Sequence, residues 1–422
     1  MRGEVGTAPG GRDAGVAGGP DRDGADGSPV DGGSEPGDRL LPVYRRPDLL
    51  FVRGEGSRLH TADGRTYLDF TSGIGVNALG HGSPVVRDAI EAALETGLVH
   101  TSNLYRTAPG EALAELLVSL SFPGAVFFCN SGAEAGEAAF KFARRAARER
   151  GGPAKHEIVA FRGSFHGRLF GTLAATDRPG YREPFEPLMP GVRFVDVGDS
   201  AALEEAVSPS RTAAVVVEPI QGEGGVRPVP AAFLRELRTL CTEREASLIF
   251  DEVQCGLGRT GRLFAYQGAG VEPDLLCLAK PLAGGLPMGA VVVAEEVGSA
   301  VVPGDHATTF GGGPLVASVA LAVVSRLADP AFLEGVATRG RWLEERLGGL
   351  RERRSVVREV RGAGLMWGLE LRAPAAEVVD AARQRGLLVV PAGASVVRLL
   401  PPLNVSLADL ETGIDRLEEA LP

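Results

Sequence analysis

The stretch LIFDEVQ, residues 248–254, carries Asp251 at the end of an apolar run, and CLAKPLAGG, residues 277–285, carries Lys280 at the end of another. Such short apolar runs are typical of buried strands, and open α/β sheets bind ligands beyond the carboxyl ends of their strands. A poorly solvated lysine there is partly neutral and can form an imine with a carbonyl, while a buried carboxylate needs a cationic partner. Taken alone, however, a strand-end Asp and a loop Lys more often form a surface ion pair.

Other apolar runs repeat this pattern through the middle of the chain and alternate with helical segments. Strands are predicted at residues 126–130, 158–161, 213–217, 248–250, 275–279 and 290–294. This alternation predicts an α/β fold with a mainly parallel sheet covered by helices. We expect this large domain to span residues 85–325.

The flanking regions predict a small α+β domain in two pieces, residues 39–84 and 326–422. Short strands are expected at 50–56 and 66–70, a helix at 332–347, paired strands within 356–371 and an amphipathic helix around residues 407–417. Residues 1–38 are rich in Gly and Asp and hold no aromatic residue. Such a segment buries too little apolar surface to offset the entropy of ordering, and we expect a disordered tail.

Composition excludes several classes of protein. The 422 residues are 44% hydrophobic and 23% charged, enough for one large core and a smaller one. The formal net charge of −10 argues against nucleic acid as a partner. Apolar runs stay well below the roughly 20 residues that span a bilayer, and the N-terminus has no hydrophobic signal region, so a cytoplasmic location is expected. The four cysteines show no CxxC spacing and no HExxH occurs, which predicts no metal site.

Three further segments carry candidate binding groups. SGAEA, residues 131–135, stands between a predicted strand and helix, so the Ser131 hydroxyl and the amides of Gly132 and Ala133 could hold a phosphate, although plain N-capping is an equal alternative. GSFHGR, residues 163–168, places an aromatic beside an arginine, which could cover a flat ring and meet a carboxylate; a Phe in a turn is usually core. Residues 306–314 suit a second phosphate contact or an ordinary loop.

Together these motifs resemble one known family. SGAEA, FHGR, EPIQGEGG at 218–225, DEVQ followed by GRTG at 258–261, and Lys280 occur in the order found in class III pyridoxal-phosphate aminotransferases. The chain looks most like the acetylornithine and succinylornithine group, with ornithine aminotransferase next. The resemblance runs from about Leu40 to the C-terminus, and it implies PLP-dependent transferase fold type I with a homodimeric assembly.

The resemblance implies a role for each matching residue. Lys280 would be the imine-forming lysine and Asp251 the partner of the pyridinium nitrogen. The remaining cofactor contacts would come from Ser131, Gly132, Ala133, Phe165, Val253, Gln254 and, from the neighbouring subunit, Thr309. His166 is expected to be a neighbour of the site and not a metal ligand.

Substrate contacts are implied in the same way. Arg168 would bind the carboxylate of the amino donor, with Thr308 near the substrate. Arg398 would take the α-carboxylate of glutamate, and Glu223 would pair with that arginine while the ω-amine is bound; the alternative for these two is a surface salt bridge. The implied reaction moves the ω-amino group of N-acetylornithine to 2-oxoglutarate, as in arginine biosynthesis.

Departures from the family pattern keep other substrates open. Gly313 stands where relatives usually have Asn, Ser83 where they have a second His, and Pro281 where they have a small residue. Alternatives are an ornithine, 4-aminobutyrate or secondary-metabolite ω-aminotransferase, and a catalytically silent homologue that binds the cofactor. An NAD-dependent dehydrogenase fits poorly, because no GxGxxG follows an early strand with an acid about twenty residues on.

Overall fold

The computed structural model describes residues 39–422, so the expected disordered tail over 1–38 lies outside the described residues. The chain divides into two units, Met1–Arg45 and Arg46–Pro422. Residues 39–45, the described part of the first unit, are exposed and form no helix or strand. Every element named below lies in the second unit.

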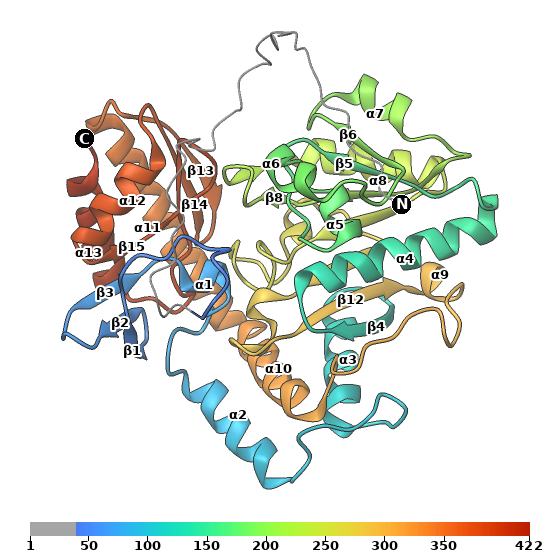
Figure 1. The fold of residues 1–422 in the computed structure, drawn as a ribbon, viewed down its shortest axis with the longest axis horizontal. Helices are drawn as coiled ribbons and strands as arrows, with labels where there is room; N and C mark the ends of the chain where they lie inside the picture. The colour runs from blue at the N-terminus through green and yellow to red at the C-terminus, as the bar shows by residue number, and fades with distance from the viewer. Residues whose placement is uncertain (1–38) are drawn as a thin grey trace, which may run out of the picture. The chain divides into compact units, whose positions relative to one another are not determined.

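A seven-stranded sheet forms the centre of this unit (Figure 1). Its strand order is β4 (Gly124–Cys129), β12 (Gly289–Ala294), β11 (Leu275–Leu278), β10 (Ser247–Asp251), β7 (Thr212–Val217), β5 (Glu157–Phe161) and β6 (Val192–Val195). The pairings from β11 to β6 are parallel, whereas β12 runs antiparallel to both of its neighbours, β11 and β4. The mainly parallel sheet and its predicted strands are therefore confirmed, with β12 as the one reversed strand.

Helices cover both faces of this sheet, which is why its strands read as unbroken apolar runs. On one face, α4 (Gly132–Gly151) packs its alanines and phenylalanines with Val216 and Ile249. On the other, α8 (Ala231–Glu243) packs with Val215 and Leu248. Successive strand residues point to opposite faces, so adjacent valines of β7 enter two different cores.

A second group of strands joins sequence-distant parts of the chain. Strands β1 (Phe51–Glu55), β2 (Arg58–Thr61) and β3 (Thr66–Asp69) form a sheet that β15 (Leu387–Leu388) extends by pairing in parallel with β3. A further sheet has the order β13 (Val357–Ala363), β14 (Met366–Leu371), β17 (Val396–Leu399) and β16 (Val390–Pro391). The early strands and the C-terminal elements lie side by side in Figure 1, an arrangement that supports a two-piece small domain; its boundaries stay a prediction.

Three helices accompany these sheets. They are α11 (Pro330–Arg353), α12 (Ala375–Gln384) and α13 (Leu407–Ala420). The first extends beyond the expected 332–347 at both ends. The Asp329 carboxylate caps its N-terminus by accepting from the Phe332 amide at 2.7 Å, which sets its start at Pro330. The expected paired strands and terminal helix are also present.

The remaining helices and short elements connect these layers. They are α1 (Ser72–Gly75), α2 (Pro84–Glu95), α3 (Ala108–Leu120), α5 (Phe170–Ala174), α6 (Pro179–Arg182), η1 (Glu183–Phe185), α7 (Ser200–Ala206), β8 (Ile220–Gln221), β9 (Arg227–Pro228), η2 (Ala265–Gly268), η3 (Lys280–Ala283), α9 (Glu295–Gly298) and α10 (Pro314–Leu327). Within residues 39–422, no single helix is long and apolar enough to cross a membrane, and α10 and α11 meet that test only as a pair bent by 64°.

Candidate active site

The carboxyl ends of β4, β5, β7, β10 and β11 meet at one edge of the central sheet, because these strands run in the same direction. A cavity of about 420 Å³ lies there, within the usual range of roughly 300–1,000 Å³ for small-molecule sites. Of the residues predicted for the site, it is lined by Ser131, Gly132, Ala133, Phe165, Arg168, Glu223, Asp251, Val253, Gln254 and Lys280. Residues from five separate loops therefore surround one space, as expected for a ligand site of an open α/β sheet.

Lys280 begins the short turn η3 directly after β11 and lines this cavity. Burial lowers the pKa of its amine to about 8; the nearby Arg398 charge adds to the effect, while Glu223, Asp251 and other carboxylates oppose it. Compared with a lysine at 10.5, this raises the neutral fraction at pH 7 by about 300-fold. The amine is thus prepared for attack on a carbonyl and for proton transfer near neutral pH.

Asp251 ends β10, and two groups fix its carboxylate. The His166 Nδ1 lies 2.8 Å from Asp251 Oδ2, and the Val253 amide donates to Oδ1 at 3.0 Å. Burial disfavours the imidazolium of His166, but its hydrogen bond to Asp251 and the charges of Asp251 and Glu218 outweigh this and raise the His166 pKa. His166 therefore balances and orients the Asp251 carboxylate.

The contact between His166 and Asp251 was not predicted from the sequence. The sequence placed His166 near the site through its neighbour Phe165, but the partner lies 85 positions further along the chain. Only the packing of the β5 loop beside the end of β10 brings the two side chains together.

Glu218, which follows β7, is a second such residue. Its carboxyl group is buried and accepts from the Phe165 amide at 2.9 Å and from the Gly222 amide at 3.1 Å. Burial raises its pKa to about 7, with a lowering contribution from His166 and a raising one from Asp251. Glu218 thus links the loop that contains Phe165 to the segment that follows β7.

The turn between β4 and α4 presents the start of a 20-residue helix to the cavity. The Ser131 Oγ accepts from the Glu134 amide at 3.2 Å, so the N-cap alternative is realised, while the hydroxyl hydrogen can still be donated. Gly132 lies close to the DEVQ segment, residues 251–254: a Cβ at Gly132 would be 2.6 Å from Cγ1 of Val253. The helix dipole and first-turn amides favour an anion at this end of the cavity.

Arg168 lies at the exposed side of the cavity between aromatic rings. Its guanidinium carbon is 3.5 Å from the ring centroid of Tyr181 and 5.8 Å from that of Phe165. No ion pair of Arg168 is found within residues 39–422. Stacking covers a face of the guanidinium and leaves its in-plane N–H groups for a carboxylate.

Arg398 extends from β17, in a different sheet, and is almost fully buried with 1% of its surface exposed. It does not line the cavity itself but contacts two residues that do, Glu223 and Gln254. Its Nη1 donates to Glu223 Oε1 at 2.7 Å and to Gln254 Oε1 at 2.8 Å. Burial opposes ionisation of Glu223, but the Arg398 charge and hydrogen bond outweigh it and lower the pKa of Glu223. Arg398 is buried and Glu223 is half-buried, with 29% of its side chain exposed, so the pair lies beside the cavity and not on the outer surface, as the alternative had it.

Thr308 and Thr309 do not line this cavity within the single chain. They line a separate cavity of about 800 Å³, together with His100 and Asn103 among others. Thr308 is nevertheless linked to the first cavity, because its Oγ1 accepts from the Nδ2 of Asn130 at 3.3 Å.

No group of three or more His, Cys, Asp or Glu side chains that could hold a metal ion occurs among residues 39–422. Cys129, Cys241, Cys255 and Cys277 are all free thiols in buried positions.

Comparisons with known proteins agree with this arrangement. The family model described as aminotransferase class-III matches residues 42–421. The acetylornithine aminotransferase of Methanocaldococcus jannaschii is 46% identical over 379 residues, which cover 90% of this chain and 95% of that protein. The solved N-acetylornithine aminotransferase of Stenotrophomonas maltophilia is 38% identical with a TM-score of 0.78, covering 89% and 96% of the two chains.

A second solved structure is that of the Toxoplasma gondii ornithine aminotransferase, described with partial occupancy of PLP at its active site. It is 30% identical to this chain with a TM-score of 0.86, and 90% of this chain and 92% of that one are covered. The matched region contains every element of the sheet-edge cavity. On this agreement of sequence, fold and site, the chain belongs to the class-III aminotransferase family and is an aminotransferase.

Proposed function

We propose that this aminotransferase uses pyridoxal 5′-phosphate and moves the ω-amino group of N-acetylornithine to 2-oxoglutarate. The proposal is supported chiefly by one cavity that is lined by Lys280, Asp251 and Glu223, with the buried Arg398 held behind its wall by a 2.7 Å contact to Glu223. The likeness to acetylornithine aminotransferases over nine-tenths of the chain supports the choice of substrate.

The cavity residues fit the cofactor in type and position. The first turn of α4 offers amides to a phosphate, and Gly132 has no side chain, which lets the backbone and Val253 approach each other. Phe165 and Val253 could enclose a flat ring, and Asp251 could hold a protonated ring nitrogen. When bound, pyridoxal phosphate supplies an aldehyde for the amino group and a ring that withdraws electrons from the adjacent carbon.

The protein's own residues then have distinct tasks. Asp251, oriented by His166, would stabilise positive charge on the ring nitrogen of the cofactor. Lys280 would anchor the cofactor, and its amine, with a pKa of about 8, is suited to move a proton between the substrate carbon and the cofactor carbon beside it. A single residue thereby serves as anchor and as acid-base group.

Two arginines would divide substrate recognition between the half-reactions. Arg168 presents its in-plane N–H groups to the carboxylate of the amino donor. Arg398 is engaged by Glu223 and Gln254 while an amine occupies the cavity, and it would be released for the second carboxylate of a dicarboxylate substrate. The buried Arg398 charge needs a partner at all times, whereas the half-buried Glu223 can turn toward solvent, which makes the pair suited to switching.

We further propose that the functional unit is a homodimer in which Thr309 reaches the phosphate bound by the neighbouring subunit. Thr309 is exposed and lies outside the cavity that holds Lys280, so a contact from its own chain is not available. Nearby exposed apolar side chains, Leu104, Tyr105 and Phe310, would gain burial in such an interface.

A panel of amino donors tests the proposed substrate. Glutamate formation from 2-oxoglutarate would be measured with N-acetylornithine, succinylornithine, ornithine and 4-aminobutyrate, and kcat/KM should be greatest with N-acetylornithine. A greater value for ornithine or 4-aminobutyrate would assign the enzyme to the corresponding alternative. No turnover with any donor by a protein that has bound the cofactor would indicate a silent homologue.

A further inference from the structure

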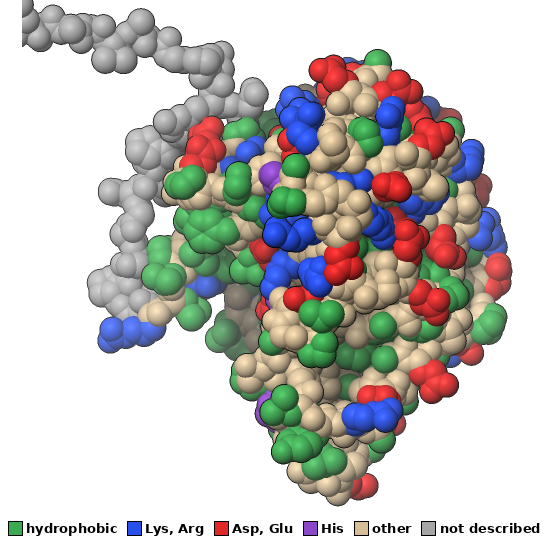
Figure 2. Space-filling model, turned by 90° about the vertical axis from the view of Figure 1, so that its right-hand side faces the viewer, with side chains coloured by type: hydrophobic (Ala, Val, Ile, Leu, Met, Phe, Trp, Pro, Cys, Tyr) green, Lys and Arg blue, Asp and Glu red, His purple; other side chains and the backbone are tan. Residues whose placement is uncertain are grey.

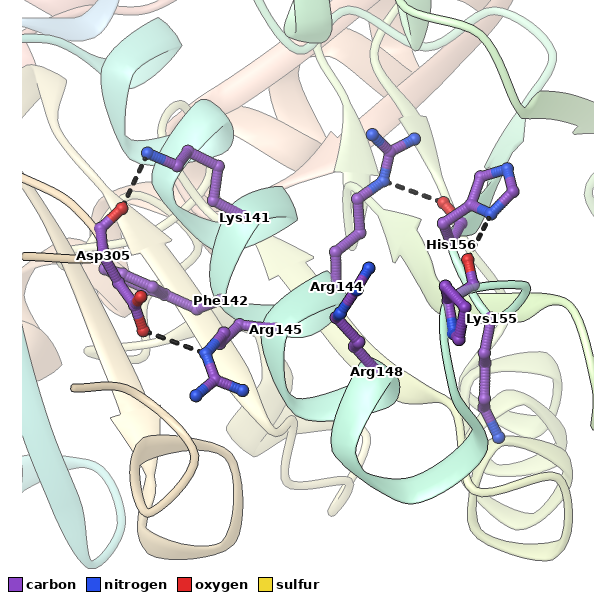
Figure 3. Close-up of a pocket in the computed structure, with 9 residues that line it drawn as sticks. Lys141, Phe142, Arg144, Arg145, Arg148, Lys155, His156 and Asp305 are labelled. Carbon is purple, nitrogen blue, oxygen red and sulfur yellow. Dashed lines mark hydrogen bonds and ion pairs between the residues drawn. The ribbon is translucent and has the colours of Figure 1, made fainter.

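A second cavity, of about 300 Å³, lies along the helix α4 and shares no lining residue with the active-site cavity. It is lined by Lys141, Phe142, Arg144, Arg145, Arg148, Pro153, Lys155, His156 and Asp305. Figure 3 shows four of these cationic side chains projecting from α4 on one side of the helix. The lining of this cavity thus contains five cationic side chains and one carboxylate, and the Lys155 ammonium is turned toward carbonyl oxygens outside the lining.

The spacing of the four helical cations is the first argument for a ligand. Lys141, Arg144, Arg145 and Arg148 follow the pattern i, i+3, i+4, i+7, which places them on one face of α4. Like charges at i and i+4 destabilise a helix, and this face contains two such pairs. A bound anion would remove that repulsion.

The charges of Arg144 and Arg148 are not neutralised by the protein. Arg144 donates to the carbonyl oxygens of His156 at 2.8 Å and Pro190 at 3.1 Å, and it has no carboxylate partner within residues 39–422. No hydrogen bond or ion pair of the Arg148 side chain occurs in the described part of the chain. By contrast, Asp305 accepts from Arg145 at 3.0 Å.

The position of this cluster is unusual for an acidic chain. The net charge is −10, and the chain has three lysines, of which two, Lys141 and Lys155, line this one cavity. The Lys155 ammonium donates to the carbonyl oxygens of Pro209 and Arg244, so it adds charge from beneath the cavity without a carboxylate of its own. Figure 2 shows Lys and Arg side chains gathered across the middle of one face of the molecule.

Stabilisation of the helix dipole is a simpler role for Arg148, which lies in the last turn of α4. That role does not account for Arg144 and Lys141, which lie one and two turns further from the helix end. The same role applies to Arg351 in the last turn of α11, which lines none of the described cavities. Arg351 therefore provides a matched control.

We propose that this cavity binds a small diphosphate-bearing anion. Guanidinium groups recognise phosphate oxygens through paired N–H donors, and two arginines without carboxylate partners stand one helical turn apart, about 5.4 Å along the axis. Two linked phosphoryl groups can contact both. The cavity volume is at the lower end of the range for small-molecule sites, which suits pyrophosphate or the diphosphate of a nucleotide.

The experiment is calorimetric titration of the holoenzyme with inorganic pyrophosphate and with adenosine diphosphate at physiological salt. The bound cofactor fills its own phosphate site in this preparation. Binding of one pyrophosphate per chain is expected, weakened at least tenfold by Arg148→Ala and by Lys141→Gln, and unchanged in Arg351→Ala and Arg168→Ala. Tighter binding of adenosine diphosphate than of pyrophosphate would identify a nucleotide as the source of the diphosphate.

Several results would overturn the proposal. One is absence of pyrophosphate binding at physiological salt, and another is wild-type affinity in Arg148→Ala and Lys141→Gln. A third is binding of citrate with the same affinity as pyrophosphate. Loss of binding in Arg168→Ala would place the anion in the active site. Within residues 39–422 the Arg148 side chain makes no hydrogen bond or ion pair that its truncation could break, and thermal unfolding of each variant would show whether folding is retained.

Discussion

Replacement of the two active-site arginines by alanine should impair different half-reactions. Arg168→Ala should slow the half-reaction with N-acetylornithine more than that with glutamate, because this arginine is proposed to hold the carboxylate of the amino donor. Arg398→Ala should do the reverse, because Arg398, which contacts Glu223 in the structure, is proposed to bind the second carboxylate of a dicarboxylate substrate. The two variants should therefore show opposite selectivity.

The structure also ranks the two losses. Loss of a charge-assisted contact in a desolvated site costs about 2–5 kcal/mol, or roughly 30-fold to several thousand-fold in kcat/KM. Arg168 is exposed, so its loss should fall at the lower end of that range. Arg398 is 1% exposed and donates to both Glu223 and Gln254, so its loss should fall at the upper end.

Part of the Arg398 effect would come from leaving Glu223 without its partner in a low-dielectric site. The double variant Glu223→Ala/Arg398→Ala separates that part, since it should recover some of the rate with the amine substrate but none with glutamate. Arg351→Ala controls for the loss of one positive charge from the chain.

Single-turnover rates for each half-reaction can be followed by the change in cofactor absorbance between its aldehyde and amine forms. Equal losses in both half-reactions for both arginine variants would refute the division of recognition, and would leave the arginines with a structural role only.

Three further predictions concern neighbouring residues. Tyr181→Leu should raise the KM for the amino donor about two- to fivefold with little change in kcat, because an exposed cation–π contact is worth about 0.5–1 kcal/mol; an unchanged KM would mean that Tyr181 does not position Arg168. In the apoprotein, the Lys280 pKa of about 8 lies below its unfolded value of 10.5, so between these pH values the unfolded state binds more protons and the free energy of unfolding increases with pH. Urea unfolding should show a smaller increase for Lys280→Met than for the wild type. An identical increase would contradict the lowered pKa. Thr309→Ala should weaken cofactor retention in a dimer that remains intact by sedimentation, whereas full activity in a wild-type monomer would exclude a shared site.

Much of the fold could be predicted from the sequence because the strands of the central sheet are buried on both faces. Their apolar runs are short and bounded, and the ends of β10 and β11 are marked by Asp251 and Lys280. The direction of β12 could not be predicted in this way, since a strand buried on both faces shows the same apolar pattern whether it runs parallel or antiparallel.

The candidate site was predictable where one motif supplies both the residue and the local structure around it, as at Ser131 in the turn between β4 and α4. Contacts between motifs were not predictable from residue patterns. The carboxylate of Asp251 meets His166 only because two loops converge, and Tyr181 covers Arg168 from a short helix with no motif of its own. Those contacts depend on the tertiary structure.

Covalent trapping identifies the residue that holds the cofactor, which we propose to be Lys280. Borohydride reduction of the holoenzyme followed by peptide mapping should place the cofactor on Lys280 alone among the chain's three lysines, and Lys280→Ala should remain folded but retain no reducible label and no turnover. Recovery of the reduced cofactor on Lys141 or Lys155, or turnover by Lys280→Ala, would contradict the account.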